Sequence, residues 1–297
     1  MSQMRDGLVV IDKPSGMTSH DVVARVRKQF KTRRVGHGGT LDPMATGILV
    51  LGINNGTKAL SFISSATKTY TATVRLGAAT VTDDAAGEQI SVVDASHVTD
   101  EEIARVLNSM VGEIDQVPSS VSAIKVAGER AYAKVRAGEK VELAARKVHI
   151  FKIAITDIFR AGPFVEVDIS VECGSGTYIR AIARDLGNAL GVGGHLTALR
   201  RVESAGFTLD DAVTIDRAAT GFLPLNIGLA RFMPKVTVAD GDVLSVSRGQ
   251  RLAWNFGEPQ PVVEVQDATG TVLAIGKWIE ENGVSLLAYH CVFNSEV

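Results

Sequence analysis

The sequence predicts an α/β protein, of the α+β kind, followed by a small β module. Strands with apolar residues occur throughout the first 230 residues, and helices with capping signals lie between them. From about residue 231 the pattern changes to short strands separated by the turns DATG and EENG, as in a small β-barrel. We therefore expect one large domain over 1–229 and a C-terminal module over 230–297, with the boundary near 228–232.

The first elements are a strand, a helix and a second, buried strand. GLVVI (7–11) predicts a strand, and DKPSGM after it predicts a turn. Thr18 or Ser19 can cap a helix that runs to about Phe30. The basic, glycine-rich loop KTRRVGHGGTLDPMATG then leads into GILVLGI (47–53), an apolar run of strand length that we expect to be buried.

The middle of the chain predicts further strands and one well-capped helix. A short helix begins near Thr57, and the strand TYTATVRLG then alternates, with Tyr70, Ala72, Val74 and Leu76 on one face. Thr99 and Glu102 form a capping box ahead of an apolar stripe at helical spacing. The helix after Thr99 is therefore structural.

The stretch 118–150 is basic and short of large apolar residues, which indicates an excursion from the core. Val165, Val167, Ile169 and Val171 alternate with polar residues and predict a strand with one solvated face. This strand ends in CGSG, and we expect Thr177 to cap the helix TYIRAIARDLGNAL (177–190).

Composition excludes several classes of protein. The chain has 297 residues, of which 45% are hydrophobic and 22% charged, and this is the composition of an ordinary globular protein. The N-terminus has no long apolar region, and no stretch approaches the length of a membrane span. Two distant cysteines fit a reducing compartment, so we expect a cytoplasmic protein. The six histidines lack ligand spacing, and we expect no metal site.

Charge is segregated along the chain although the net charge is only -2. Residues 1–36 hold eight Lys/Arg against three Asp, 125–150 hold seven against three Glu, and 180–201 hold four against one Asp. Residues 81–117 hold nine acidic residues against one Arg. If the basic segments converge in space, they form a cationic face that would bind nucleic acid. For each segment alone, solvated surface charge is the simpler interpretation.

One carboxylate, Asp42, lies between a glycine-rich turn and a proline in GHGGTLDPMATG (36–47). The glycines permit backbone angles that other residues avoid, and Pro43 pushes Asp42 into an extended conformation. Asp42 is therefore on a stiff connection into the core. The residues alone leave two interpretations open, a turn aspartate that accepts local amides and a functional carboxylate.

An arginine in the first turn of a helix is a second unusual feature. Cations stabilise the C-terminal end of a helix, yet Arg180 falls at the start of 177–190. It needs a carboxylate, a carbonyl or a phosphate beside it. Tyr178 adds an aromatic ring at the same junction, where a core role is equally compatible with the residues. A carboxylate, an arginine and tyrosines within a basic surface would suit reaction at a flipped base or its sugar.

Several motifs in register now make the family recognisable. LVVIDKPSGMTSHDVV, GHGGTLDPMATGILVLGINNGTK, KTYTATVRLGAATVTDDAAGE, GTYIRAIARDLG and HLTALRR occur in this order over roughly 190 residues. Together they closely resemble the bacterial tRNA pseudouridine-55 synthases, the TruB family. PSSVSAIKVAGERAYAKVRAG resembles that family's RNA-gripping insertion, and the segment with DATGTVLAIGK resembles a PUA-type RNA-binding module, which is a weaker match.

This resemblance implies a mixed-sheet pseudouridine synthase core and a single catalytic aspartate, Asp42. It implies isomerisation of uridine 55 in the TΨC loop: the N1–C1′ bond breaks, the uracil turns, and C5 bonds to C1′. The reaction is redox-neutral and hydrolyses nothing, so no cofactor is expected. The carboxylate would act near C1′ as it does in glycosidases. Whether Asp42 attacks C1′, attacks C6 or deprotonates the sugar stays open.

The resemblance also carries over binding residues one by one. The residues expected at the flipped base and its loop are His37, Tyr70, Tyr178, Arg180 and Leu199. Those expected at the RNA backbone are Lys125, Arg130, Lys134, Arg136 and Lys140. The role of Asp84, in a family motif, stays open because hydrogen bonding to a neighbouring loop is as good an interpretation. We expect Lys13 and Pro14 to be structural.

We therefore expect a tRNA pseudouridine synthase that binds the TΨC stem-loop as a monomer, without a protein partner or a membrane. A rival of another class is a tRNA-binding folding chaperone whose catalysis is secondary or lost. The set of Asp42, Tyr70, Tyr178 and Arg180 favours catalysis over that rival. A nucleoside hydrolase would need carboxylates that activate water or bind a metal, and the sequence shows no such set.

Overall fold

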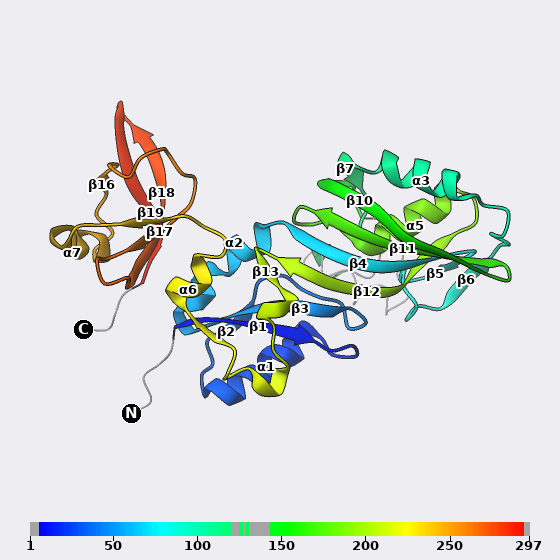
Figure 1. Cartoon of the computed structure of the whole chain (residues 1–297), viewed down its shortest axis with the longest axis horizontal. Coiled ribbons are helices and arrows are strands. Elements are labelled where there is room, and N and C mark those ends of the chain that lie inside the picture. The colour runs from blue at the N-terminus through cyan, green and yellow to red at the C-terminus, as the bar shows by residue number, and fades with distance from the viewer. Residues whose placement is uncertain (1–5, 120–124, 127–128, 131–142, 294–297) are drawn as a thin grey trace.

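A central sheet of ten strands organises the larger part of the molecule (Figure 1). The computed structural model describes residues 6–119, 125–126, 129–130 and 143–293. The strands of the central sheet are β1 (Gly7–Lys13), β2 (Val35–His37), β3 (Thr46–Ile53), β4 (Lys68–Leu76), β7 (Gly112–Gln116), β10 (Arg146–Ala161), β11 (Phe164–Cys173), β12 (Gly194–Ser204), β13 (Phe207–Thr208) and β14 (Phe222–Pro224). Two small hairpins pair β5 (Ala78–Thr80) with β6 (Gln89–Val92) and β8 (Lys125–Val126) with β9 (Glu129–Arg130).

The described helices are short. The α-helices are α1 (Ser19–Phe30), α2 (Leu60–Ser65), α3 (Asp100–Ser109), α5 (Ile179–Ala189), α6 (Leu225–Leu229) and α7 (Val243–Ser247). Of these, α1, α3 and α5 pack on the central sheet, whereas α7 belongs to the C-terminal part. The 3-10 turns are η1 (Asn54–Ala59), η2 (Leu209–Asp211), η3 (Ile215–Arg217) and η4 (Asp240–Asp242). Within the described part of the chain, no helix is long and apolar enough to cross a membrane.

The sheet is mixed, as the family resemblance implies. Its main order is β14-β1-β3-β12-β4-β11-β10-β7, with β2 paired to β3 and β13 paired to β12. The β3–β12 pairing is parallel, and the other pairings within the sheet's described strands are antiparallel. This one parallel contact joins two halves of the sheet, and the ends of β3, β4 and β12 meet near it. Tyr70 of β4 pairs there with Arg201 of β12.

Apolar periodicity explains how the helices cover the sheet. α1 packs beside β2 and β3, whereas α3 and α5 pack on the half formed by β4, β10 and β12 (Figure 1). Their inward residues share one buried cluster with those of the strands, among them Val26, Val74, Ile103 and Leu186. The predicted strands at 47–53, 70–76 and 165–171 and the helix after Thr99 are all confirmed.

Two of the three predicted helix caps are confirmed. Thr18 caps α1 and Thr99 caps α3, each in a capping box with the acidic residue three positions later. The cap predicted at Thr177 is wrong, because the N-cap of α5 is Tyr178. The Thr177 hydroxyl instead donates to the Gly174 carbonyl at 3.0 Å. The Thr177 hydroxyl therefore bonds the backbone of the preceding turn and does not cap the helix.

The insertion predicted over 118–150 is shorter at its C-terminal end. Residues 146–150 belong to β10 and pair with 112–116 of β7 in the central sheet. Val148 and Ile150 are buried there while Lys147 and His149 are exposed, which is the alternation of a half-buried strand. Lys147 is on the exposed face and forms a 2.8 Å ion pair with Glu113 of β7.

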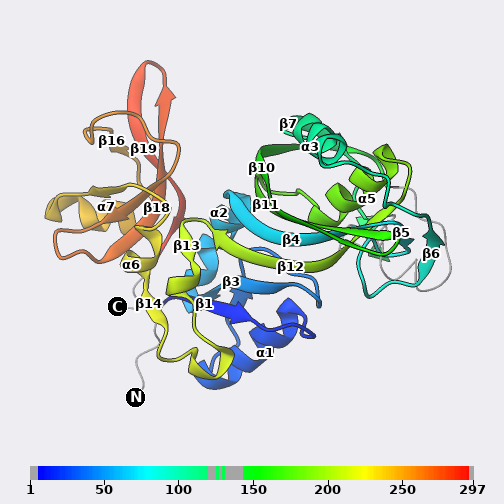
Figure 2. The same cartoon turned by 45° about the vertical axis from the view of Figure 1, so that its right-hand side comes forward.

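The C-terminal part is a β-rich module with a core of its own. Its sheet has the order β15-β17-β18-β19-β16, from β15 (Lys235–Thr237), β16 (Leu252–Ala253), β17 (Val263–Gln266), β18 (Val272–Glu281) and β19 (Val284–Val292). Figure 2 shows α6 between this module and the central sheet. Leu225, Leu229, Ile275 and Phe293 form a buried cluster across the junction. The division at 229/230 follows the end of α6 and stays a prediction.

Candidate active site

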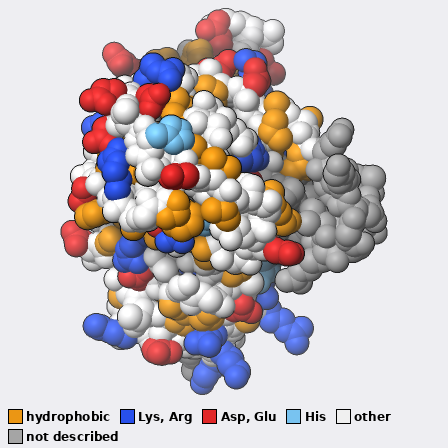
Figure 3. All heavy atoms as spheres, turned by 90° about the vertical axis from the view of Figure 1, so that its right-hand side faces the viewer, with side chains coloured by type: hydrophobic (Ala, Val, Ile, Leu, Met, Phe, Trp, Pro, Cys, Tyr) orange, Lys and Arg blue, Asp and Glu red, His pale blue; other side chains and the backbone are white. Residues whose placement is uncertain are grey.

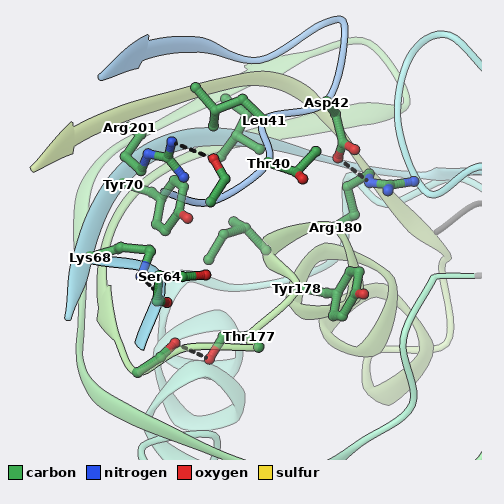
Figure 4. A pocket seen from close by; sticks show the side chains of 15 residues that line it. Thr40, Leu41, Asp42, Ser64, Lys68, Tyr70, Thr177, Tyr178, Arg180 and Arg201 are labelled. Carbon is green, nitrogen blue, oxygen red and sulfur yellow. Dashed lines mark hydrogen bonds and ion pairs between the residues drawn. The ribbon is translucent and has the colours of Figure 1, made fainter. Parts of the chain in front are cut away.

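A pocket of about 250 Å³ opens where the loop before β3 meets the start of α5 (Figure 4). The residues that line it come from this loop, from α2 and β4, from the turn before α5, from the start of α5 and from β12: Gly39, Thr40, Leu41, Asp42, Ser64, Lys68, Tyr70, Gly174, Gly176, Thr177, Tyr178, Ile179, Arg180, Leu199 and Arg201. Five residues expected from the sequence thus line one cavity: Asp42, Tyr70, Tyr178, Arg180 and Leu199.

The loop that carries Asp42 is held on both sides by the last residue of β1, Lys13, and the first residue of α1, Ser19. Buried Ser19 donates to the Leu41 carbonyl at 3.1 Å and accepts from the Leu41 N–H at 2.9 Å. Lys13 has no exposed surface and donates through Nζ to the carbonyls of Met17, Pro14 and Pro43 at 2.7, 2.9 and 3.3 Å. Burial lowers the pKa of Lys13 to about 8. Asp42 therefore stands on a connection fixed before and after it.

Arg180 meets Asp42 directly, as its position in the helix requires. Its Nε is 2.9 Å from Oδ2 of Asp42, and its Nη1 donates to the Thr82 carbonyl at 2.9 Å. The Arg180 side chain is 4% exposed, whereas that of Asp42 is 34% exposed. The buried guanidinium thus orients a carboxylate whose surface remains partly accessible in the pocket.

The open question about Asp84 has a structural answer. Its Oδ2 lies 3.6 Å from Arg180 Nη1, and its Oδ1 accepts from the Thr82 hydroxyl at 2.6 Å and the Ala86 N–H at 3.0 Å. Asp84 is buried behind Arg180. It therefore orders its own loop and adds a second carboxylate beside the guanidinium.

Tyr70 forms a wall of the pocket together with two buried cations. Burial, the main effect, raises the pKa of Tyr70, which keeps its phenol neutral. Arg201 is 1% exposed and donates to the carbonyls of Ile48 at 2.7 Å and Gly39 at 3.1 Å. Lys68 donates to the carbonyls of Ser64 at 2.8 Å and Ala66 at 2.6 Å, and burial lowers its pKa to about 8.

Lys68 and Arg201 were not predicted to be site residues, although the sequence holds a signal for each. Lys68 is in phase with Tyr70 and Ala72 on the inward face of β4. Arg201 is in phase with Leu199 on β12. A cation on the apolar face of a strand requires buried acceptors, and here backbone carbonyls supply them.

His37 does not line this pocket. It ends β2, and its ring meets the ring of His20 edge-on with centroids 5.4 Å apart. Burial, the largest effect, lowers the pKa of His37. Its Nδ1 is buried without a hydrogen-bond partner among the described residues. A role of His37 in supporting a flipped-out RNA loop stays a prediction.

The residues expected at the RNA backbone are mostly outside the described residues. Lys134, Arg136 and Lys140 lie there, and Lys125 and Arg130 are described only as backbone partners in the β8–β9 hairpin. Their contacts with RNA stay predictions. Within the described residues, no group of three or more His, Cys, Asp or Glu is placed to hold a metal ion.

The arginines of 180–201 do not form the open cationic surface that their charge balance indicates. Arg180 and Arg201 are buried. Arg184 pairs with Asp83 at 3.3 Å and with Asp185, while Arg200 pairs with Asp12 at 2.8 Å. On the face in Figure 3, Lys and Arg side chains are mixed with Asp and Glu. Two of these four arginines are therefore part of the protein interior, and the other two form ion pairs with neighbouring aspartates.

Two family models match consecutive parts of the chain. The TruB family pseudouridylate synthase N-terminal domain matches residues 27–179, and the tRNA pseudouridylate synthase B C-terminal domain matches 180–222. The first match includes Asp42 and Tyr70, and the second begins at Arg180. The pocket is therefore built from both matched segments.

Known proteins similar to this chain agree with these matches. The tRNA pseudouridine synthase B of Paenarthrobacter aurescens is 53% identical over 262 residues, covering 87% of this chain and 84% of the relative. That of an Arthrobacter species is 52% identical over 275 residues, covering 91% and 90%. The crystal structure of a Cbf5-Nop10-Gar1 complex matches with a TM-score of 0.74 at 25% identity, covering 98% of this chain and 86% of that one. Sequence, fold and pocket together show that the chain belongs to the TruB family of pseudouridylate synthases.

Proposed function

We propose that this TruB-family pseudouridine synthase converts the uridine at position 55, in the TΨC loop of tRNA, to pseudouridine. The observation that carries the proposal is the 2.9 Å ion pair of Asp42 with Arg180 in the wall of the pocket. The relatives named tRNA pseudouridine synthase B support the substrate class. The particular uridine follows from the resemblance to pseudouridine-55 synthases.

The geometry supports a reaction at the sugar of a base that has left its stack. Asp42 supplies an anion where the N1–C1′ bond breaks, and Arg180 holds that anion in one orientation. Tyr70 and Leu199 supply an aromatic and an aliphatic wall for a flipped uracil. The uracil then bonds through C5 to C1′, C5 loses its proton and N1 gains one, so product and substrate are isomers. Attack at C1′, attack at C6 and deprotonation of the sugar remain three routes for Asp42.

The proposal extends to where and how the enzyme acts. It acts on tRNA as a monomer in the cytoplasm, without a protein partner. Cys173 and Cys291 are both free thiols, which is typical of proteins in a reducing compartment. Light scattering of the purified chain with and without tRNA tests the monomer, and a dimeric mass would contradict it.

Asp42→Asn tests the proposed catalytic role. The change removes the anion and little volume, so pseudouridine formation should be abolished while tRNA affinity stays within about threefold of wild type. The assay is tritium release from C5-labelled tRNA with the modified position mapped. Asp12→Asn is a matched control, because Asp12 is 38% exposed and also pairs with an arginine, Arg200, outside this pocket.

Each outcome decides between specific alternatives. Turnover by Asp42→Asn near the wild-type rate would refute the catalytic assignment. Equal loss of binding and turnover would indicate that Asp42 is structural. Modification at a position other than 55 would refute the proposed substrate uridine. If wild type binds and refolds tRNA but releases no tritium, the chaperone interpretation replaces catalysis.

A further inference from the structure

The side chain of Gln116 binds both backbone polar groups of one pocket residue. Gln116 ends β7 and is 2% exposed. Its Oε1 accepts from the Tyr178 N–H at 2.8 Å, and its Nε2 donates to the Tyr178 carbonyl at 3.1 Å. A primary amide that bonds one residue in this two-point manner fixes both the position and the rotation of that backbone unit.

Gln116 holds the start of α5, where the N-cap residue makes no side-chain capping bond within the described part of the chain. The first N–H groups of a helix lack partners inside the helix. Tyr178 is the N-cap and makes no side-chain capping bond, and the hydroxyl of Thr177 is directed to Gly174. Gln116, from a strand 62 positions earlier, therefore holds the end of the helix that lines the pocket.

A second contact joins the same segment to α5 farther along the helix. Arg184 donates through Nη2 to the Val117 carbonyl at 2.7 Å. It also pairs through Nη1 with Asp83 at 3.3 Å, next to Asp84. The stretch 116–117 is thus bonded to α5 at two points that are more than one turn apart. A shift or rotation of α5 would break both contacts.

We propose that Gln116 is a positioning residue for the reaction. By fixing the backbone of Tyr178, it places the Tyr178 ring in the pocket and the Arg180 guanidinium against Asp42 (Figure 4). The inference rests on the proposed function, because the geometry it secures is that of Asp42 and the base pocket. A misplacement of about 1 Å at such groups costs roughly 100-fold in rate.

Gln116→Met and Gln116→Glu separate this role from packing. Methionine keeps the length but forms neither hydrogen bond, whereas glutamate keeps an acceptor for the Tyr178 N–H. Gln116→Met should lower the single-turnover rate with tRNA by roughly 10- to 100-fold, and Gln116→Glu by less. The Kd for tRNA should stay within about threefold, because Gln116 is buried and contacts protein.

Gln29→Met is the matched control. Gln29 also donates its amide to a distant backbone carbonyl, that of Ile215 at 2.7 Å, but it lies outside the pocket. Its variant should retain the wild-type rate once the folded fraction, measured by thermal unfolding, is taken into account. A rate for Gln116→Met within threefold of wild type would refute the proposal. An equal loss in Gln29→Met would attribute the effect to general destabilisation.

Hydrogen exchange of the Tyr178 amide tests the contact without any need for activity. The wild-type amide should be protected, and Gln116→Met should exchange at least about tenfold faster there while the middle of α5 is unchanged. Unchanged exchange in Gln116→Met would refute the positioning role even where the enzyme forms pseudouridine. If the wild-type enzyme forms no pseudouridine, the proposed function is refuted. Hydrogen exchange of the Tyr178 amide still shows in that case whether Gln116 holds Tyr178.

Discussion

Replacing Arg180 separates charge from geometry at the proposed catalytic aspartate. Its guanidinium bonds Asp42 through Nε and the Thr82 carbonyl through Nη1, both at 2.9 Å, and lies 3.6 Å from Asp84. Arg180→Met removes every one of these contacts. Arg180→Lys keeps the charge, but one ammonium group cannot reproduce the planar fork.

The structure sets the expected magnitudes. Removing one partner of a buried ion pair costs about 3–5 kcal/mol. Asp42 is 34% exposed and Asp84 keeps its bonds from Thr82 and Ala86, so the lower end, about 3 kcal/mol, applies to Arg180→Met. A charge-assisted hydrogen bond is worth about 1.5–3 kcal/mol. If the hydrogen bond to Asp42 contributes this free energy in the transition state, the rate of Arg180→Met is roughly 10- to 100-fold below that of wild type. The rate of Arg180→Lys should lie between those of wild type and Arg180→Met.

Three measurements decide the outcome: the free energy of unfolding in urea, the Kd for tRNA, and the single-turnover rate of tritium release. We expect the Kd to stay within about threefold, because Arg180 is 4% exposed and directed to carboxylates. Arg160→Met is a matched control, since Arg160 bonds a carboxylate, Asp100, and a carbonyl, Val98, away from the pocket. A full rate in Arg180→Met would refute the orienting role. A loss of affinity parallel to the rate would show that Arg180 binds a phosphate.

Two further predictions concern the C-terminal module and the insertion. Burial raises the pKa of Glu264 to about 7, so the stability that its protonation contributes is complete below about pH 4.5 and is lost as the pH rises through 7. Glu264→Gln should gain up to about 3 kcal/mol over wild type in urea unfolding at pH 8, and little at pH 5. The exposed Glu280→Gln should show no such trend, and an equal effect of Glu264→Gln at both pH values would contradict the reasoning. Neutralising Lys134, Arg136 and Lys140 together should flatten the salt dependence of tRNA binding by up to about 0.9 per lost duplex-phosphate contact. A slope equal to that of wild type would show that these residues do not touch the backbone.

Local patterns predicted the elements whose stability is local. The capping boxes at Thr18 and Thr99 place all their partners within four residues, so the sequence contains the whole motif. The alternation of apolar and polar residues in 70–76 predicts a strand with one buried face, and β4 has such a face. The need of Arg180 for a carboxylate, a carbonyl or a phosphate was also predictable from its place in the first helical turn, and the structure supplies Asp42, Asp84 and the Thr82 carbonyl.

Contacts made across the sheet could not be read from the sequence. Gln116 caps a helix from 62 positions away, and Arg201 bonds Ile48 from 153 positions away. Local rules therefore assigned the α5 cap to Thr177, which had the appropriate side chain but a closer acceptor at Gly174. The charge balance of 180–201 was similarly ambiguous, because a count of arginines does not distinguish buried ion pairs from a surface that binds RNA.

The place of Arg180 in α5 explains why an unfavourable helix position is used at all. Helical side chains tilt toward the N-terminus, so an arginine in the first turn extends beyond the helix end. From there it reaches two loops that are far apart in sequence, one carrying Asp42 and the other carrying Thr82 and Asp84. Arg184, one turn later, instead reaches Asp83 and the Val117 carbonyl. Two carboxylates and a carbonyl offset the unfavourable dipole, and the helix start thereby becomes the point where the aspartate loop is oriented.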